Sequence, residues 1–248
     1  MLNKKTCVVT GASGSIGKAI VNKFSLLNYN VIAIDKLNMP KDMNCFFYLK
    51  ADLSRCFFDK KYCNRIFNLI KKKLTNEKLH ILINNAGQQT IKKINKIQRE
   101  DWECSLNVNL LTPFLLIQFF LKELKFAKGH VLNISSIHAK LTKKYFTTYS
   151  TSKAALSAMT RSLALELAPE IKINALELGA VETSMLKKSF GNSSKSLVKL
   201  KSIHPQNKIG QPDEIALFIE SIIKNNISFL HGSCIDFTGG MHSKLSDI

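Results

Sequence analysis

The 248-residue chain lacks the features of a membrane-spanning, exported or disulfide-linked protein. Its longest apolar stretch, 114–121, is interrupted by Gln118 and is far shorter than the ~20 residues that a spanning helix needs. The amino terminus passes from two lysines into a short apolar segment and a glycine turn, which is too brief for a signal peptide. Its six cysteines form no C-x-x-C pair and no cluster with histidine. We therefore expect a soluble cytoplasmic protein with reduced thiols and no metal site.

Linkers and internal repeats are missing as well. No segment rich in proline, glycine and serine divides the chain, which contains only 5 prolines and 11 glycines. A chain of this length can bury one large core, and many α/β folds of this size are single domains. We expect one domain over residues 1–248.

Arginine and acidic residues are scarce beside the abundant lysine. Lys and Arg total 36 against 18 Asp and Glu, which gives a formal net charge of +18. Arginine suits bidentate contacts to phosphate and guanine, and few are present. The arginines are Arg55, Arg65, Arg99 and Arg161. Because the lysines are spread from end to end, the charge indicates a compositional bias, and we expect neither nucleic acid nor a membrane as a partner.

Short apolar segments alternate with amphipathic ones along the chain. Strands are expected at 6–10, 31–35, 46–49, 81–84, 131–134, 171–176 and 233–237. Helices are expected at 15–27, 60–74, 102–126, 149–167 and 215–223. This alternation predicts a doubly wound α/β fold, in which a parallel sheet of about seven strands carries helices on both faces. Segment 184–207 lacks clear periodicity, so we expect a loop or a substrate lid there.

A glycine-rich turn, Thr10-Gly-Ala-Ser-Gly-Ser-Ile-Gly17, connects the first strand to the first helix. Glycines at such a turn let the backbone approach a pyrophosphate, and the helix amino terminus stabilises the charge. Asp35 ends the second strand, where a carboxylate can accept hydrogen bonds from an adenosine ribose. The turn predicts a Rossmann-type dinucleotide site. Asp35 would repel a 2′-phosphate and so favours NAD over NADP, whereas the neighbouring Lys36 argues the other way.

Tyr149 and Lys153 lie four residues apart at the head of an apolar helical segment, thirteen residues after Ser136. In a helix this spacing places the phenol and the ammonium on one face. A nearby cation favours phenolate, so it lowers a tyrosine pKa that is ordinarily about 10. Such a tyrosine can exchange a proton near neutral pH. We expect Ser135, next to Ser136, to serve packing or a strand-end hydrogen bond.

Together these motifs resemble the short-chain dehydrogenase/reductase family in its compact single-domain form, from Thr10 to Gly240. The resemblance implies an NAD(P)-dependent oxidoreductase that interconverts a secondary alcohol and a ketone by hydride transfer, assembled as a homotetramer. It implies that the catalytic residues are Asn109, Ser136, Tyr149 and Lys153. It implies that the cofactor-binding residues are Gly11, Ser13, Ser15, Ile16, Gly17, Asp35, Asp52, Leu53, Asn85, Ala86, Gly87, Tyr149, Lys153, Val181 and Thr183.

The same resemblance assigns a role to each catalytic residue. Ser136 would hydrogen-bond the substrate oxygen, and Tyr149 would exchange the proton as general acid or base. Lys153 would lower the tyrosine pKa and bind the nicotinamide ribose. Asn109 would hold a water that connects the lysine to solvent.

The chain departs from the family pattern at three points. Ser15 stands where compact members usually carry their second glycine. Gly14 is neutral where NADP-dependent members often place a basic residue, which again favours NAD. Leu178 replaces the usual proline before Gly179.

Two polar residues suggest a substrate class. Gln89 and His138 resemble pocket residues of 3-hydroxybutyrate dehydrogenases, which implies a small hydroxy acid. Those enzymes place a carboxylate-binding lysine three positions before the tyrosine, where this chain has Phe146. Lys143 and Lys144 lie nearby without matching that position.

Two further interpretations stay open. A 3-oxoacyl-carrier-protein reductase would use NADPH, against which Asp35 and Gly14 argue, although an acidic carrier would suit the positive charge. A non-catalytic dinucleotide-sensing protein could share the fold, because fold alone does not determine function. The complete set of four catalytic residues favours an enzyme.

Overall fold

The computed structural model describes residues 4–189 and 194–244, and a parallel sheet lies at its centre. The seven strands among these residues follow the order β3-β2-β1-β4-β5-β6-β7. Their bounds are β1 Thr6–Thr10, β2 Asn30–Asp35, β3 Phe47–Lys50, β4 Ile81–Asn84, β5 His130–Ser136, β6 Lys172–Leu178 and β7 Cys234–Phe237. Since β1 pairs with both β2 and β4, the two halves of the chain diverge there. The predicted doubly wound sheet is confirmed.

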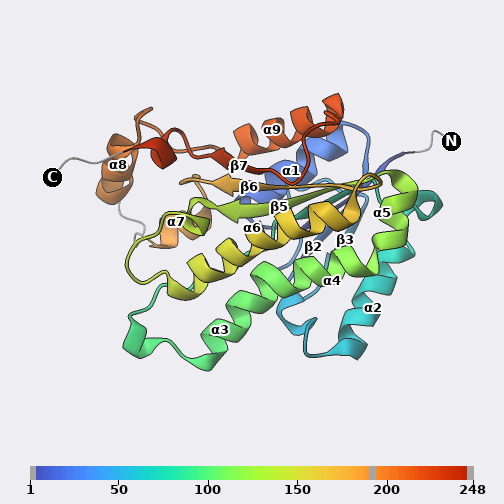
Figure 1. The fold of residues 1–248 in the computed structure, drawn as a ribbon, viewed down its shortest axis with the longest axis horizontal. Coiled ribbons are helices and arrows are strands. Elements are labelled where there is room, and N and C mark those ends of the chain that lie inside the picture. The colour runs from blue at the N-terminus through green and yellow to red at the C-terminus, as the bar shows by residue number, and fades with distance from the viewer. Residues whose placement is uncertain (1–3, 190–193, 245–248) are drawn as a thin grey trace.

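Helices cover both faces of the sheet (Figure 1). One face is covered by α1 (Ser15–Leu26) and α9 (Pro212–Asn225), whose apolar sides pack on the strands. The other face carries α2 (Lys60–Lys71), α4 (Thr112–Phe119), α5 (Leu121–Ala127) and α6 (Thr147–Leu167).

Side chains of the central strands alternate between two hydrophobic cores. Along β1, Val8 packs in the core beneath α2, α4 and α6, whereas Cys7 and Val9 pack beneath α1 and α9. A strand buried on both faces needs apolar residues at every position, which is why its sequence shows a continuous apolar segment.

The helix expected at 102–126 is not continuous, which corrects that prediction. It begins as α3 (Arg99–Leu106), passes through a π-helical segment at Asn107–Leu111 into α4, and bends by 65° before α5. Phe120, at the bend, is fully buried and packs against Phe67 of α2. Apolar residues continue across the bend from α4 to Leu121 and Leu124 of α5, so periodicity alone does not show it.

In the described part of the chain, no single helix is long and apolar enough to cross a membrane; the bent pair passes that test only when its two parts are combined, and on length and composition alone.

Several bounds near the cavity also differ from expectation. Strands β5 and β6 run two residues further, to Ser136 and Leu178, and α6 begins at Thr147. The segment expected as a loop or lid contains two helices, α7 (Ser184–Ser189) and α8 (Ser194–Ile203), while 190–193 lie outside the described residues. Both helices lie at one end of the sheet, opposite α5 (Figure 1).

Candidate active site

A cavity of about 590 Å³ opens at the carboxyl ends of the strands, where a doubly wound sheet binds its ligands. Residues at the ends of five neighbouring strands line it. They are Gly11 after β1, Asp35 of β2, Asn85 after β4, Ser136 of β5 and Leu178 of β6.

The glycine turn lies against the segment after β4 too closely for side chains. Gly11 has φ +63°, and a Cβ there would lie 2.7 Å from the Ala86 Cα. A Cβ at Gly17 would lie 2.1 Å from the Gly11 carbonyl oxygen. The Asn85 amide donates to the carbonyls of Thr10 and Gly11, at 3.0 Å each, and joins the two segments. The turn thus forms a cradle of bare backbone at the amino terminus of α1, which fits a pyrophosphate.

Asp35 lies on the cavity wall and is already hydrogen-bonded to backbone. Its carboxylate accepts from the Ser13 and Leu37 N–H groups, both at 2.9 Å. Ser13 is absent from the cavity wall, and its hydroxyl lies 2.7 Å from the Tyr48 hydroxyl. The structure therefore shows Ser13 orienting Asp35, and its direct contact with a cofactor stays a prediction.

The other predicted cofactor-binding residues line the same cavity. Asp52 also caps the short turn Leu53–Arg55 by accepting from the Ser54 N–H at 3.0 Å. Those on the wall are Gly11, Ser15, Ile16, Gly17, Asp35, Asp52, Leu53, Asn85, Ala86, Gly87, Tyr149, Lys153, Val181 and Thr183.

Three of the four predicted catalytic residues meet on the cavity wall. Ser136 ends β5, while Tyr149 and Lys153 lie one turn apart on α6. Asn109 is fully buried behind them in the π-helical segment. Its side chain accepts from the Gln88 N–H at 2.8 Å and donates to the Gln88 carbonyl at 2.9 Å. Asn109 therefore secures the backbone that follows Gly87, and its predicted link to water stays a prediction.

Lys153 is 3% exposed, and its ammonium donates a 2.7 Å hydrogen bond to the Ile134 carbonyl. Burial lowers the pKa of Lys153 to about 8. The ammonium lies 5.9 Å from the Tyr149 ring centroid. Ser135 donates to the Lys153 carbonyl at 3.2 Å, which confirms the hydrogen bond predicted for it.

The lowered pKa predicted for Tyr149 is not found. Burial raises the pKa of Tyr149, and a hydrogen bond with Ser136 opposes that rise only in part. A phenolate is costly in apolar surroundings, and the Lys153 ammonium is directed at the Ile134 carbonyl. The resting tyrosine is therefore a neutral phenol.

The two predicted substrate residues, Gln89 and His138, both line the cavity. The His138 ring stacks on Phe146, with centroids 4.5 Å apart, and its Nδ1 lies 3.0 Å from the Thr142 hydroxyl. Burial, and next the charge of Lys143, lower the pKa of His138 to about 4, so its imidazole is neutral at pH 7.

Sequence reasoning missed most of the substrate end of the cavity. Lys143 lies on its wall with its ammonium 4.7 Å from the Phe146 ring centroid, and burial lowers the pKa of Lys143. The apolar residues of this end are Leu141, Met185, Leu186, Leu200, Ile203 and Met241. Segment 184–207, expected as a loop or lid, contains four of them, but the sequence singled out none of the six because none stands at a fixed spacing from the catalytic residues.

Known proteins with similar sequences are short-chain dehydrogenases and reductases. A family model described as short chain dehydrogenase matches residues 5–193. A 3-oxoacyl-acyl-carrier-protein reductase of Buchnera aphidicola is 31% identical, over 96% of this chain and 98% of that protein. Glucose 1-dehydrogenase 2 of Bacillus subtilis is 30% identical, over 97% and 95%.

Solved structures of dehydrogenases are similar to this chain over nearly its whole length. The ligand-free aldohexose dehydrogenase of Thermoplasma acidophilum has a TM-score of 0.90 at 26% identity, covering 100% of this chain and 97% of that one. A 4-hydroxyisoleucine dehydrogenase complexed with NADH has a TM-score of 0.86 at 26% identity, over 98% and 100%. ElxO with NADP bound has 0.84 at 26% identity, over 97% and 100%.

The chain therefore belongs to the short-chain dehydrogenase family. It is a nicotinamide-dinucleotide-dependent dehydrogenase/reductase that acts on CH–OH groups.

The glycine turn makes a matched pair of substitutions possible. Gly17→Ala forces a Cβ against the Gly11 carbonyl, whereas a Cβ at Gly14 would lie 3.4 Å from that oxygen. We expect Gly17→Ala to raise the Kd for the dinucleotide about tenfold or more, because overpacking costs about 1–3 kcal/mol. Gly14→Ala should stay within about threefold of wild type. Titration calorimetry measures both, and equal losses in the two variants would contradict the cradle.

Burial of Lys153 predicts a specific pH dependence of stability. The folded pKa of about 8 lies below the ordinary value of 10.5, so the unfolded chain binds more protons between these pH values. The free energy of unfolding of the wild type minus that of Lys153→Met should therefore be constant below pH 8. It should rise by about 3 kcal/mol between pH 8 and pH 10.5. Urea unfolding across this range tests it. A difference independent of pH would show that the lysine is not destabilised by burial.

Proposed function

We propose that this enzyme is an NAD-dependent dehydrogenase of secondary alcohols in which Tyr149 is the general acid or base. The observation that carries the proposal is the convergence of Ser136, Tyr149 and Lys153 on one wall of a cavity whose far end holds Asp35. The bare backbone at Gly11 and Gly17 fits the pyrophosphate between these two ends.

Each residue acts on the reacting oxygen or on a neighbour of it. The bound nicotinamide dinucleotide supplies or accepts the hydride. Ser136 donates a hydrogen bond to the substrate oxygen, and Tyr149 gives its proton to that oxygen during ketone reduction. Alcohol oxidation requires Tyr149 to lose its proton first, so its raised pKa makes oxidation faster at high pH. The Lys153 ammonium, which is charged below about pH 8 and lies 5.9 Å from the Tyr149 ring centroid, stabilises the negative charge that develops on the phenol oxygen while Tyr149 gives up its proton.

The choice of NAD over NADP rests on the adenosine end of the cavity. Asp35 presents a carboxylate there, and the neutral Gly14 offers no cation for a 2′-phosphate. Lys36 also lines this end, and the structural neighbours include one with NADH and one with NADP. Of Asp35 and Lys36, we give more weight to Asp35, because its carboxylate ends β2 and can accept hydrogen bonds from the ribose hydroxyls. NAD is therefore the proposed cofactor.

The proposed substrate is a small hydroxy acid. The acidic residues on the described cavity wall are Asp35 and Asp52, and both belong to the adenosine end. The substrate end instead presents Lys143, with Gln89 and neutral His138 as hydrogen-bonding groups. A carboxylate suits this end because it meets one cation and no acid there.

The reductase interpretation keeps one supporting observation, the 31% identity to the Buchnera carrier-protein reductase. It requires NADPH, which Asp35 disfavours. A sensor without turnover is the third interpretation, and the intact catalytic group argues against it. Binding and turnover assays separate all three.

We also propose a homotetramer in the cytoplasm, with segment 184–207 as the lid. Leu165 on α6 is 86% exposed, which supports a covered α6 face in an assembly. The six cysteines are free, which suits a reducing compartment. Met185 and Ile203, from the two helices of the segment, line the cavity and so support the lid.

Tyr149→Phe tests the assignment of the proton donor. The ring and its packing remain, so NAD should raise the melting temperature of this variant as much as that of wild type. Turnover of an alcohol and hydroxy-acid panel should fall at least about 100-fold, the size of a lost general acid. Wild-type binding of NAD without turnover of any panel member would favour the sensor. Tighter binding of NADPH would favour the reductase.

Lys143→Met tests the substrate class, with Lys144→Met, at an exposed neighbouring lysine, as control. We expect the KM for 3-hydroxybutyrate to rise about tenfold in Lys143→Met, while the KM for its uncharged methyl ester stays unchanged. Lys144→Met should match wild type with both substrates. The hydroxy-acid assignment fails if the ester is the better wild-type substrate or if both KM values rise together.

A further inference from the structure

Three polar residues form a row across the last three strands. Ser135 of β5 pairs in register with Glu177 of β6, which pairs in turn with Asp236 of β7. Residues paired in register lie on the same face of a sheet, so the two carboxylates are cross-strand neighbours. Like charges at such positions repel, and the burial of Glu177 strengthens the repulsion although Asp236 is 39% exposed. The row therefore needs a cation.

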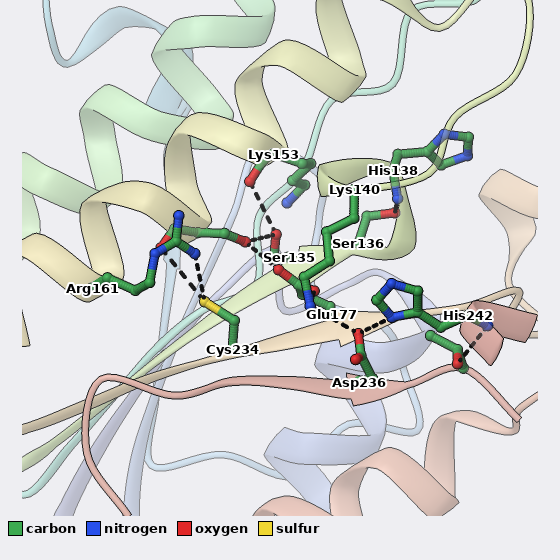
Figure 2. A network of polar contacts seen from close by, with 12 residues as sticks. Ser135, Ser136, His138, Lys140, Lys153, Arg161, Glu177, Cys234, Asp236 and His242 are labelled. Carbon is green, nitrogen blue, oxygen red and sulfur yellow. Dashed lines mark hydrogen bonds and ion pairs between the residues drawn. The ribbon is translucent and has the colours of Figure 1, made fainter. Parts of the chain in front are cut away.

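Lys140 supplies that cation. Its ammonium lies 2.9 Å from Glu177 and 3.4 Å from Asp236 (Figure 2). The Glu177 side chain is 1% exposed, and its second oxygen accepts from the Ser157 hydroxyl at 2.8 Å. The ion pair with the Glu177 carboxylate raises the pKa of Lys140, so the ammonium stays charged at neutral pH. Ser157 lies 2.9 Å from Ser135, which closes the network onto β5.

Lys140 belongs to the loop that forms one wall of the substrate end. It follows the 3-10 turn Ile137–Ala139, whose first residue comes directly after Ser136. The loop carries His138 and Lys143 on the cavity wall, two and three residues from Lys140. The contacts of the Lys140 ammonium with Glu177 of β6 and Asp236 of β7 therefore fix the position of the 137–146 loop relative to the sheet.

A second segment of the cavity wall, the turn Met241–Ser243, is attached to Asp236. His242 Nδ1 lies 2.7 Å from the Asp236 carboxylate, in the turn Met241–Ser243, and Met241 lines the cavity. Figure 2 shows Lys140 and His242 approaching Asp236 from two sides. Segments about one hundred residues apart in sequence thus share one anchor.

We propose that Lys140, Glu177 and Asp236 form an ionic clamp that positions the two substrate-side walls, and that Lys140 is a positioning residue for the reaction. The clamp rests on the proposed function only in that these walls hold the substrate. It touches neither the glycine turn nor Asp35. Its loss is therefore expected to loosen the substrate end and leave dinucleotide binding intact.

Hydrogen–deuterium exchange of the full chain with NAD tests the clamp without a substrate. In Lys140→Met, peptides of the 137–146 loop should exchange about tenfold faster than in wild type. In Asp236→Asn, which weakens both contacts, the 238–244 segment should exchange faster as well. Peptides of 11–17 should not change. Lys140→Arg should restore wild-type exchange, and Lys144→Met is the matched control.

Kinetics supply the second readout. The KM for 3-hydroxybutyrate should rise and its kcat fall in Lys140→Met, the KM for NAD should stay within about twofold, and Lys140→Arg should recover both losses. If Lys140→Met does not fold, Glu177→Gln removes the charge while keeping an acceptor for Ser157.

The clamp is overturned if the loop alone loosens in Asp236→Asn, or if Lys144→Met matches Lys140→Met. Absence of wild-type turnover together with the expected exchange pattern would remove the proposed function and keep the clamp.

Discussion

The hydrogen bond from the buried Lys153 ammonium to the Ile134 carbonyl, 2.7 Å long, is the contact on which the active site depends. It joins α6 to the carboxyl end of β5 and brings Tyr149, one helical turn earlier, beside Ser136. Ser135 reinforces the same junction by donating to the Lys153 carbonyl. Keeping a charge away from water has a cost, which is visible in the lowered pKa of Lys153.

The cavity is polarised along its length, and this organises binding. Carboxylates at Asp35 and Asp52 lie at one end, bare glycine backbone follows, and Lys143 lies at the other end beyond Tyr149. Under the proposed function, an adenosine ribose would meet hydrogen-bond acceptors at one end, and a substrate carboxylate would meet the Lys143 ammonium at the other. The substrate walls come from two distant segments, which Glu177 and Asp236 hold through Lys140 and His242. The strands therefore position the residues expected to be catalytic, and in the proposed clamp the contacts of Glu177 and Asp236 position the walls of the substrate end.

Sequence reasoning succeeded for features that depend on residues close together in the chain. The alternation of apolar segments predicted the sheet, and the spacing of Tyr149 and Lys153 placed both side chains on one wall, because a helix repeats every 3.6 residues. It failed for features that depend on contacts between residues distant in the chain. At the bend, Phe120 packs against Phe67, which is distant in the sequence, and the raised pKa of Tyr149 depends on burial by the whole fold. Lys143 fell outside any motif because a loop, with no fixed period, carries it.

The sequence by itself determined the doubly wound architecture through short-range periodicity and the dinucleotide turn through a compact motif. Its resemblance to the family then implied the four residues expected to be catalytic. Only the tertiary structure decided how those residues are charged, which loops enclose the substrate, and that Glu177 and Asp236 share Lys140. Burial and cross-strand pairing join residues far apart in the chain. Their electrostatic consequences exist only once the strands are side by side.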